Sequence, residues 1–411
     1  MDFKFIGAGS AGTPPYIKPV LSAYSRLQER PSLQPGALVD RARALLMERY
    51  GVAGGEGEAA FAHGVTGLVS EHTHYFDGFA LLMPLPQGTA VAVRRAAGQA
   101  SRVVFDGEDR DWALGDEAAG ADALPLWGCV VDALARRLAP GEAVEAAVVS
   151  TVRAASADGY LAALGMATVR ALQALFALPQ GTSELVHTVA DVIAACRGYA
   201  FSVAYPLAAD AGVARAFLLI DTATVEYLTL DLPPFDTLGW GLVDTGVGML
   251  RSPAFYQPRK ERAEAALQRL RQRGFPRLTS FRDLEHRDLQ RALSDLPARY
   301  RGVVRHLVTQ NRRVQRMVFA IRQADWQMFG ALMLMAHASL REDWEGSHPR
   351  VDFVVQQVRD MSLDGMYGAS MTDAGGTVLV AGQPFIVPHS LDRIKEAVQD
   401  RFGIVPDVEL L

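Results

Sequence analysis

Cysteine is scarce in this sequence. Its 411 residues include two cysteines, Cys129 and Cys196, which lie far apart in the chain. Two such residues form neither a disulfide framework nor a metal site, and this usage fits a reducing compartment. The N-terminus also lacks the basic region and apolar stretch of a signal peptide. We therefore expect a cytoplasmic protein with no metal.

Long apolar runs without charge are also missing. The longest apolar run extends from Tyr160 to Leu178 and is interrupted by Arg170. It is barely long enough to cross a bilayer and carries a charge near its middle. We expect a buried core helix here, with Thr168–Leu178 inside the protein, and no membrane partner.

An excess of positive charge is absent as well. Lys and Arg number 41 against 46 for Asp and Glu, which gives a formal net charge of −5 and no field that would attract nucleic acid. Hydrophobic residues make up 49% and charged residues 21%, which is typical of globular proteins rather than disordered ones. A chain of this length usually exceeds what one core can support, so two domains are expected.

Helix-like and strand-like stretches alternate along the chain. A helical period covers 38–50, where Gly51 is placed to end the helix. Gln87-Gly88 predicts a turn between strands at 79–83 and 89–94. Ser390 predicts the N-cap of a helix over 391–402. Further helices are expected over 124–138, 158–177, 259–272 and 301–340, and further strands over 101–105, 217–221, 225–230, 240–245, 376–381 and 384–387.

The segment from Gly64 to Gly78 reads G-V-T-G-L-V-S-E-H-T-H-Y-F-D-G. It resembles the early signature of galactokinases, approximately G-R-V-N-L-I-G-E-H-T-D-Y-N-x-G, most closely at residues 71–73, Tyr75 and Gly78. Similar stretches follow in family order at 171–176, 217–221, 243–247, 337–345 and 368–372. The chain is identified by this resemblance, over roughly residues 37–400, as a member of the galactokinase branch of the GHMP kinase family.

This resemblance implies an α+β fold of two domains with a ligand cleft between them. We expect an N-terminal extension over 1–36, an N-terminal domain over 37–240 and a C-terminal domain over 241–411. The family fold implies a small-molecule ligand in the cleft, and a homodimer or a partner protein is left open.

The phosphate-binding loops depart from the family pattern. The first loop, approximately G-L-S-S-S in the family, reads A-S-A-D-G-Y-L at 155–161, so that Asp158 stands where the phosphate would lie, with Arg153 nearby. The last motif, approximately M-T-G-A-G-F-G-G, is shortened and has Asp373 in place of a glycine. Because like charges repel, we expect no ATP or ADP binding and no cofactor.

Two groups of the family's phosphoryl-transfer chemistry are also replaced. The arginine of the G-R-x-N start is Val65 here, and the segment at 197–202 that matches the family's M-D-Q aspartate holds no carboxylate. Phosphoryl transfer depends on a few placed charges. These departures together predict a chain that has lost kinase activity.

The residues that match the sugar contacts of galactokinases are retained more fully than those of the phosphate-binding loops. Glu71 and His72 stand where galactokinases contact the sugar, and His74 replaces an aspartate of the family. We interpret these three as a catalytic cluster in which a carboxylate raises the imidazole pKa, giving an acid or base near pH 7. Alternatively, Glu71 and His72 brace the fold and His74 is a solvated loop residue. The candidate ligand-binding residues are Asp77, Gly78, Arg153, Asp158, Arg197, Tyr256, Ser339 and Asp373, of which Tyr256 matches a family tyrosine and equally fits a packing role.

The preferred functional hypothesis is an ATP-independent enzyme of specialised biosynthesis, a lyase, cyclase or isomerase acting on a small polar molecule. Arg153 or Arg197 would hold an anionic group of that molecule. One alternative is a non-catalytic pseudokinase that senses a ligand or stabilises a partner protein. The other is an atypical ATP-dependent sugar kinase.

Overall fold

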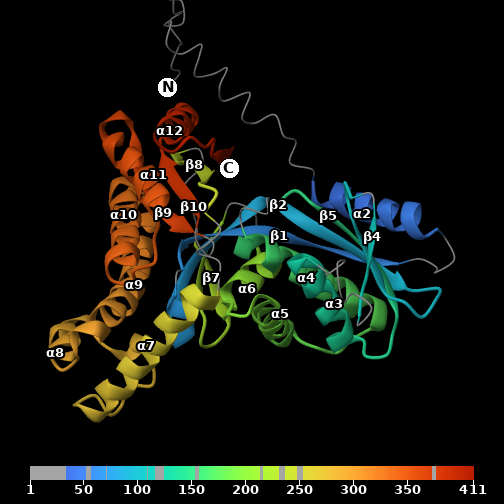
Figure 1. Cartoon of the computed structure of the whole chain (residues 1–411), viewed down its shortest axis with the longest axis horizontal. Coiled ribbons are helices and arrows are strands. Elements are labelled where there is room, and N and C mark those ends of the chain that lie inside the picture. The colour runs from blue at the N-terminus through green and yellow to red at the C-terminus, as the bar shows by residue number, and fades with distance from the viewer. Residues whose placement is uncertain are drawn as a thin grey trace, which may run out of the picture.

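A computed structural model describes residues 34–51, 57–70, 72–108, 110–115, 125–152, 157–212, 216–230, 237–247, 253–372 and 376–411. The described chain forms two sheets. One is seven-stranded, with the order β4-β3-β5-β2-β6-β7 and β1 paired to β2, and the other is four-stranded, with the order β11-β8-β10-β9. Helices accompany both sheets (Figure 1), so the predicted α+β class is confirmed.

The long strand β2 (Phe79–Arg95) is the backbone of the larger sheet. Along one edge it pairs antiparallel with β1 (Glu58–Val69). Along the other edge it pairs with β6 over Phe79–Leu82 and with β5 over Thr89–Arg95. One strand therefore connects the two halves of this sheet.

The predicted turn at Gln87-Gly88 is wrong, because β2 continues through it. Pro84 and Pro86 lack the N–H that a ladder needs. Both lie between Leu82 and Thr89, where no described strand pairs with the second edge of β2. The prolines therefore cost no ladder bond on that edge.

The remaining strands are short. The larger sheet is completed by β3 (Arg102–Phe105), β4 (Asp111–Ala113), β5 (Val144–Ser150), β6 (Phe217–Asp221) and β7 (Glu226–Leu230). The smaller sheet consists of β8 (Gly239–Asp244), β9 (Met366–Thr372), β10 (Thr377–Gly382) and β11 (Asp407–Leu410). The β6–β7 hairpin and the strand near 240 are confirmed, and only β3 and β5 pair in parallel among the described strands.

Helices cover both faces of the larger sheet (Figure 1). The helix α2 (Pro35–Tyr50) packs on one face through Leu38, Ala42 and Leu46. Gly51 ends it with a φ of 68°, as predicted. The other face is covered by α3 (Leu126–Leu138), α4 (Ala157–Phe176), α5 (Thr182–Arg197) and α6 (Ala204–Ala211).

The apolar run is the core helix α4. It is long and apolar enough to span a membrane, yet 67% of its most apolar window is buried inside the protein. Burial extends through Leu172, whereas Ala174 is exposed and the helix ends at Phe176, so the prediction that everything to Leu178 is buried was too broad. At its start, a Cβ on Gly159 would lie 1.9 Å from the carbonyl oxygen of Val65, so α4 begins directly against β1.

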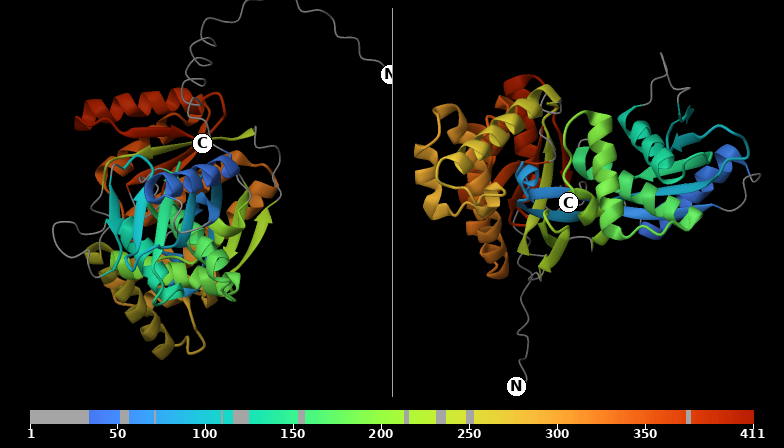
Figure 2. Two further views of the ribbon diagram at one scale, coloured as in Figure 1. Left: turned by 90° about the vertical axis from the view of Figure 1, so that its right-hand side faces the viewer. Right: turned by 90° about the horizontal axis from the view of Figure 1, so that it is seen from below.

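The C-terminal helices gather at one end of the molecule, and α2 to α6 gather at the other (Figures 1 and 2). They are α7 (Pro253–Gln272), α8 (Leu289–Ser294), α9 (Ala298–Arg322), α10 (Trp326–Glu342), α11 (Pro349–Asp360) and α12 (Val387–Phe402). We retain the domain boundary at residue 240 as a proposal.

Three predictions in this part are corrected. The expected helix over 301–340 breaks between α9 and α10, where Ala324 has a φ of 52° and Asp325 caps α10 by accepting a hydrogen bond from the Met328 N–H. The expected strand at 384–387 does not form, and Ser390 is not an N-cap. It lies buried inside α12, where its own N–H bonds to the Ile386 carbonyl.

Candidate functional site

The loop between β1 and β2 brings His72 into the interior. His72 has a φ of 65° and precedes the short helix η1 (Thr73–Phe76). Its side chain is 1% exposed and stacks on Trp344, with ring centroids 4.4 Å apart and an interplanar angle of 17°. Trp344 follows α10. The two stretches that carry the strongest family resemblance, 64–78 and 337–345, therefore meet in space.

Further rings surround His72. Tyr256 of α7 lies 5.2 Å from it, and His306 of α9 lies 6.1 Å from it. Tyr256 stacks on Tyr199, with centroids 4.5 Å apart and planes 4° from parallel. These rings are buried and come from five separate segments. We call His72, Tyr199, Tyr256, His306 and Trp344 the aromatic cluster.

A buried ion pair lies beside the aromatic cluster. The Nη1 of Arg197 lies 2.6 Å from the Oδ1 of Asp158, and their side chains are 5% and 11% exposed. The guanidinium also donates to the carbonyls of Tyr199 and Ala200, and it lies over the rings of Tyr199 and Phe201. Burial lowers the pKa of Arg197, but Asp158, Tyr199 and Tyr256 together outweigh this effect and the pKa is raised. The arginine is therefore charged and held firmly.

This pair corrects the expectation about Asp158. We expected a bare carboxylate that repels phosphate, but the charge is compensated by Arg197 at 2.6 Å. Asp158 also lies in the first turn of α4, where the helix dipole favours a negative group. The first turn of α4 therefore holds a neutralised pair rather than an excess of negative charge.

The predicted rise of the histidine pKa values is wrong. Burial lowers the pKa of His72 well below its usual 6.5, and electrostatic repulsion by His306, His74, Arg259 and Arg197 lowers it further. Burial also lowers the pKa of His74, to about 3, and the Arg197 charge lowers it as well. A hydrogen bond with the Ser70 backbone acts in the opposite direction. Both imidazoles are neutral at pH 7. Glu71, the expected carboxylate partner, lies outside the described residues.

Asp77 and Gly78 end the same loop. The Asp77 side chain is exposed, and its carbonyl accepts a hydrogen bond of 3.0 Å from Arg282. Gly78 is buried, and a Cβ there would lie 2.5 Å from the Thr73 Cβ and 2.8 Å from the Asn311 Oδ1. A side chain at residue 78 would therefore displace the loop.

Ser339 is placed within the packing of α9 against α10. Its hydroxyl donates to the Oδ2 of Asp343 at 3.0 Å and lies 3.1 Å from the Nδ1 of His306. Because His306 belongs to the aromatic cluster, Ser339 contacts that cluster directly. The other candidates, Arg153 and Asp373, lie outside the described residues. Within the described part of the chain, no group of three or more His, Cys, Asp or Glu side chains is arranged to hold a metal ion.

Comparison with known proteins identifies the family. A family profile described as the galactokinase galactose-binding signature matches residues 45–95. The galactokinase of Roseiflexus sp. (strain RS-1) is 30% identical over 320 residues, which are 76% of this chain and 80% of that protein. The chain belongs to the galactokinase branch of the GHMP kinases. The galactokinase of Streptomyces coelicolor is also 30% identical, over 372 residues that cover 85% of this chain and 90% of that protein.

Solved structures agree on the fold of this galactokinase-family chain. The crystal structure of Lactococcus lactis galactokinase complexed with galactose matches with a TM-score of 0.78 at 20% identity, over 91% of this chain and 97% of that one. The mevalonate kinase of Methanococcus jannaschii matches with a TM-score of 0.54 at 12% identity, over 87% and 98% of the two chains. The predicted GHMP kinase fold is confirmed.

The functional prediction is contradicted by these relatives. We expected a family member that had lost kinase activity and works without ATP as a lyase, a cyclase or an isomerase, with a non-catalytic pseudokinase as an alternative. The proteins that share 30% of its residues over most of the chain are galactokinases, which support a sugar kinase. Along the sequence Asp158 is an isolated charge, whereas the fold gives it a buried cationic partner.

Sequence reasoning missed several residues around the site. Trp344 and Tyr199 stand inside the family-like segments, but an aromatic residue in a motif gives no sign of which ring it will meet. His306 lies in a charged stretch predicted as helix, and Arg282 lies between the predicted helices, both without a family motif. Only the tertiary contacts assign them to this region.

Proposed function

We propose that this chain is an ATP-dependent sugar kinase that phosphorylates galactose or a closely related hexose. The observation that carries the proposal is the match of residues 45–95 to the galactokinase galactose-binding signature. That range includes the loop that packs His72 into the aromatic cluster. The relatives named galactokinase and the fold neighbour crystallised with galactose support it.

The aromatic cluster is buried, and it holds the 72–78 loop at the place where we propose that the sugar binds. The exposed C–H face of a hexose packs well on aromatic rings, while its hydroxyls need polar partners. The neutral imidazoles of His72 and His74 supply polar groups without a charge. We therefore assign the sugar to the side of the site formed by the 72–78 loop and Tyr256.

The Asp158–Arg197 pair supplies the charges for phosphoryl transfer. In the proposed reaction the Asp158 carboxylate accepts the proton of a sugar hydroxyl. The hydroxyl oxygen bonds to the γ-phosphorus of ATP, and ADP leaves with the electrons of the broken P–O bond. Arg197 holds the carboxylate in place and stabilises charge on the transferring group. The pair would thus replace the family arginine and aspartate that are missing at Val65 and at 197–202.

The use of ATP as phosphate donor also bears on where in the cell the proposed enzyme would work. A kinase of this class needs ATP as co-substrate, which agrees with the cytoplasmic location expected from the sequence. Besides ATP, the proposal requires one small-molecule substrate and no other partner.

The test is sugar-dependent formation of ADP. The purified chain is incubated with Mg-ATP and a panel of hexoses, and both ADP and the sugar phosphate are measured. We expect turnover with galactose or a close relative. Asp158→Asn should lower kcat by about 10²–10⁴-fold, the usual effect of removing an acid–base group, while keeping a hydrogen-bond acceptor for Arg197.

The matched control is Asp210→Asn. Asp210 pairs with Arg170 of α4 at 2.5 Å, an ion pair that lies elsewhere on the same helix. This variant should keep the parent kcat. If no hexose stimulates ADP formation, the proposed function is wrong. If Asp158→Asn and Asp210→Asn have equal effects, the assignment of Asp158 to the chemistry is wrong.

A further inference from the structure

The loop that carries His72 is closed by its own hydrogen bonds. The Gly78 N–H donates to the Thr73 carbonyl at 3.0 Å, and the Thr73 hydroxyl donates to the Phe79 carbonyl at 3.0 Å. Two residues of the loop that are not glycine, His72 and Asp77, have left-handed φ values of 65° and 55°. Such conformations cost free energy and persist only where the surroundings hold them. The loop therefore needs external anchors.

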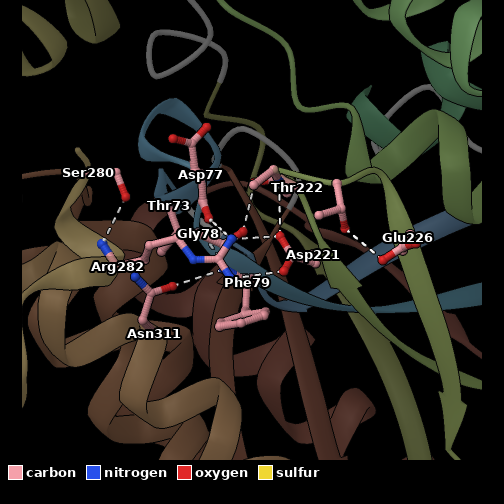
Figure 3. Close-up of polar contacts among 12 residues, drawn as sticks. Thr73, Asp77, Gly78, Phe79, Asp221, Thr222, Glu226, Ser280, Arg282 and Asn311 are labelled. Atoms are coloured by element: carbon pink, nitrogen blue, oxygen red, sulfur yellow. Dashed lines mark hydrogen bonds and ion pairs between the residues drawn. The ribbon is translucent and has the colours of Figure 1, made fainter.

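Arg282 is the most prominent of these anchors. It lies in the short helix η4 (Phe281–Asp283), and its Nη1 donates to the Asp77 carbonyl at 3.0 Å and to the Asp221 Oδ1 at 2.7 Å. Its Nη2 donates to the Asp221 Oδ2 at 2.8 Å, which completes a bidentate pair. Figure 3 shows the guanidinium between Asp221 and the loop, with the Asp77 carboxylate pointing away from it.

Two more side chains hold the main chain at the end of the loop. The Thr222 hydroxyl donates to the Gly78 carbonyl at 2.7 Å, and the Asn311 Oδ1 accepts from the Phe79 N–H at 2.9 Å (Figure 3). Thr222 follows β6, and Asn311 belongs to α9. Together with Arg282, they attach three successive residues of the loop backbone to three different elements. We call Arg282, Asp221, Thr222 and Asn311 the loop clasp.

The position of Arg282 is itself fixed. The Ser280 hydroxyl accepts from the Arg282 N–H at 3.2 Å, and the Asp283 carboxylate accepts from the Ser280 N–H at 3.0 Å, forming a capping box. Phe281 is buried and packs edge-on against Phe76 of the loop, 4.9 Å between centroids. The hydrogen bond with Arg282 also lowers the pKa of Asp221. The clasp is therefore preorganised.

We propose that Arg282 is a positioning residue for the sugar-binding loop, and that the loop clasp sets the affinity for the sugar without contacting it. This inference rests on the proposed sugar kinase activity. Arg282 holds the main chain at Asp77, while His72, at the other end of the loop, faces the aromatic cluster. The side chains of Arg282 and Asp221 are 25% and 24% exposed, so their bidentate pair is partly shielded from solvent. Its effect is expected on the conformation of the loop.

The test compares steady-state kinetics of Arg282→Gln with the parent chain, with the best hexose and with Mg-ATP varied separately. We expect KM for the sugar to rise by about tenfold to a hundredfold, the effect of losing hydrogen bonds to a charged donor. KM for Mg-ATP should stay within about twofold, because the clasp holds only the sugar loop. Arg282→Lys keeps the charge but not the bidentate geometry. Its KM for the sugar should therefore lie between those of the parent chain and of Arg282→Gln.

The control is Arg393→Gln, which breaks the exposed Arg393–Asp364 pair of 3.0 Å in another part of the molecule. It should behave like the parent. If Arg282→Gln leaves KM for the sugar unchanged, or raises both KM values together with a lower melting temperature, the positioning role is overturned.

Amide hydrogen exchange separates this inference from the proposed function. Without any sugar, peptides covering 73–79 should exchange faster in Arg282→Gln than in the parent, while peptides from α12 should not change. If no hexose is phosphorylated but this local change is seen, the proposed function fails and the clasp stands as an anchor of the loop. If exchange over 73–79 is unchanged, the clasp itself is refuted.

Discussion

At the scale of single residues, the site combines charges that are already paired with imidazoles that stay neutral. Asp158 and Arg197 compensate each other in a region with little solvent. That positive guanidinium lowers the pKa of His74 in addition to the effect of burial. His74 is thus biased toward its uncharged form, which suits hydrogen bonding to sugar hydroxyls.

The lowered histidine pKa values predict acid sensitivity. A histidine whose pKa is lower in the folded state binds fewer protons there than in the unfolded state, so stability is lost as the pH falls below 6.5 toward the folded pKa, about 3 for His74. Each pH unit in this window removes up to about 1.4 kcal/mol per histidine. His74→Leu should therefore flatten the fall of the unfolding free energy between pH 6.5 and 4, measured by urea titration.

The control for this titration is His187→Gln on the exposed side of α5. Because the His187 side chain is exposed, this variant shows whether the removal of any histidine changes the slope of stability against pH. An equal slope in His74→Leu and the parent would mean that His74 is not the group whose protonation opens the structure.

At the scale of elements, the site depends on how closely α4 begins against β1. Glycine at residue 159 lets the first turn approach the Val65 carbonyl, and this turn carries Asp158 toward Arg197. The sequence shows that residue 159 is a glycine, but it does not show why a glycine is needed there. We had related it to a phosphate loop, whereas the structure gives it a packing role between a helix and a strand.

Gly159→Ala tests this close approach. The added Cβ would lie 1.9 Å from a backbone oxygen, so the first turn of α4 must move away from β1. We expect a loss of about 1–3 kcal/mol in unfolding free energy, typical of overpacking, and weaker sugar-dependent turnover because Asp158 moves with the turn. Denaturant unfolding and the ADP assay measure the two effects.

Gly36→Ala is the matched control for that variant. Gly36 lies in the first turn of α2, and nothing stands within 4 Å of a Cβ there. Since alanine is the better helix former, this change should be neutral or slightly stabilising. Equal losses in both variants would show that the contact with Val65 is not what excludes a side chain.

At the scale of the whole molecule, the site joins segments that are distant in sequence. The aromatic cluster takes His72 from the β1–β2 loop, Tyr199 after α5, Tyr256 from α7, His306 from α9 and Trp344 after α10. A ligand bound among these segments stabilises them together. Its binding should therefore be visible in the unfolding of the entire chain.

We expect the sugar substrate to raise the melting temperature in a single transition. Binding to the folded state alone stabilises it by about 2.7 kcal/mol at a concentration of 100 times Kd. Scanning calorimetry with galactose, and with mannitol as an osmolyte control, measures this shift. A shift no larger than that with mannitol, or one confined to a separate transition, would contradict a site shared by these segments.

The sequence by itself determined the family, the α+β class and several elements, because these follow from local patterns. The helical period before Gly51, the β6–β7 hairpin and the apolar helix α4 could be predicted from spacing alone. Prediction from the sequence failed at Gln87-Gly88 and at Ser390, where long-range pairing and packing override a local turn or cap signal.

Only the tertiary structure decided the electrostatics of the site and its supports. Whether Asp158 repels phosphate depends on the partner across the chain, and Arg197 is that partner. Whether His72 and His74 hold protons depends on burial, which a sequence does not record. Coulombic and desolvation energies are set by distances in space, whereas the signature of a family is set by order along the chain.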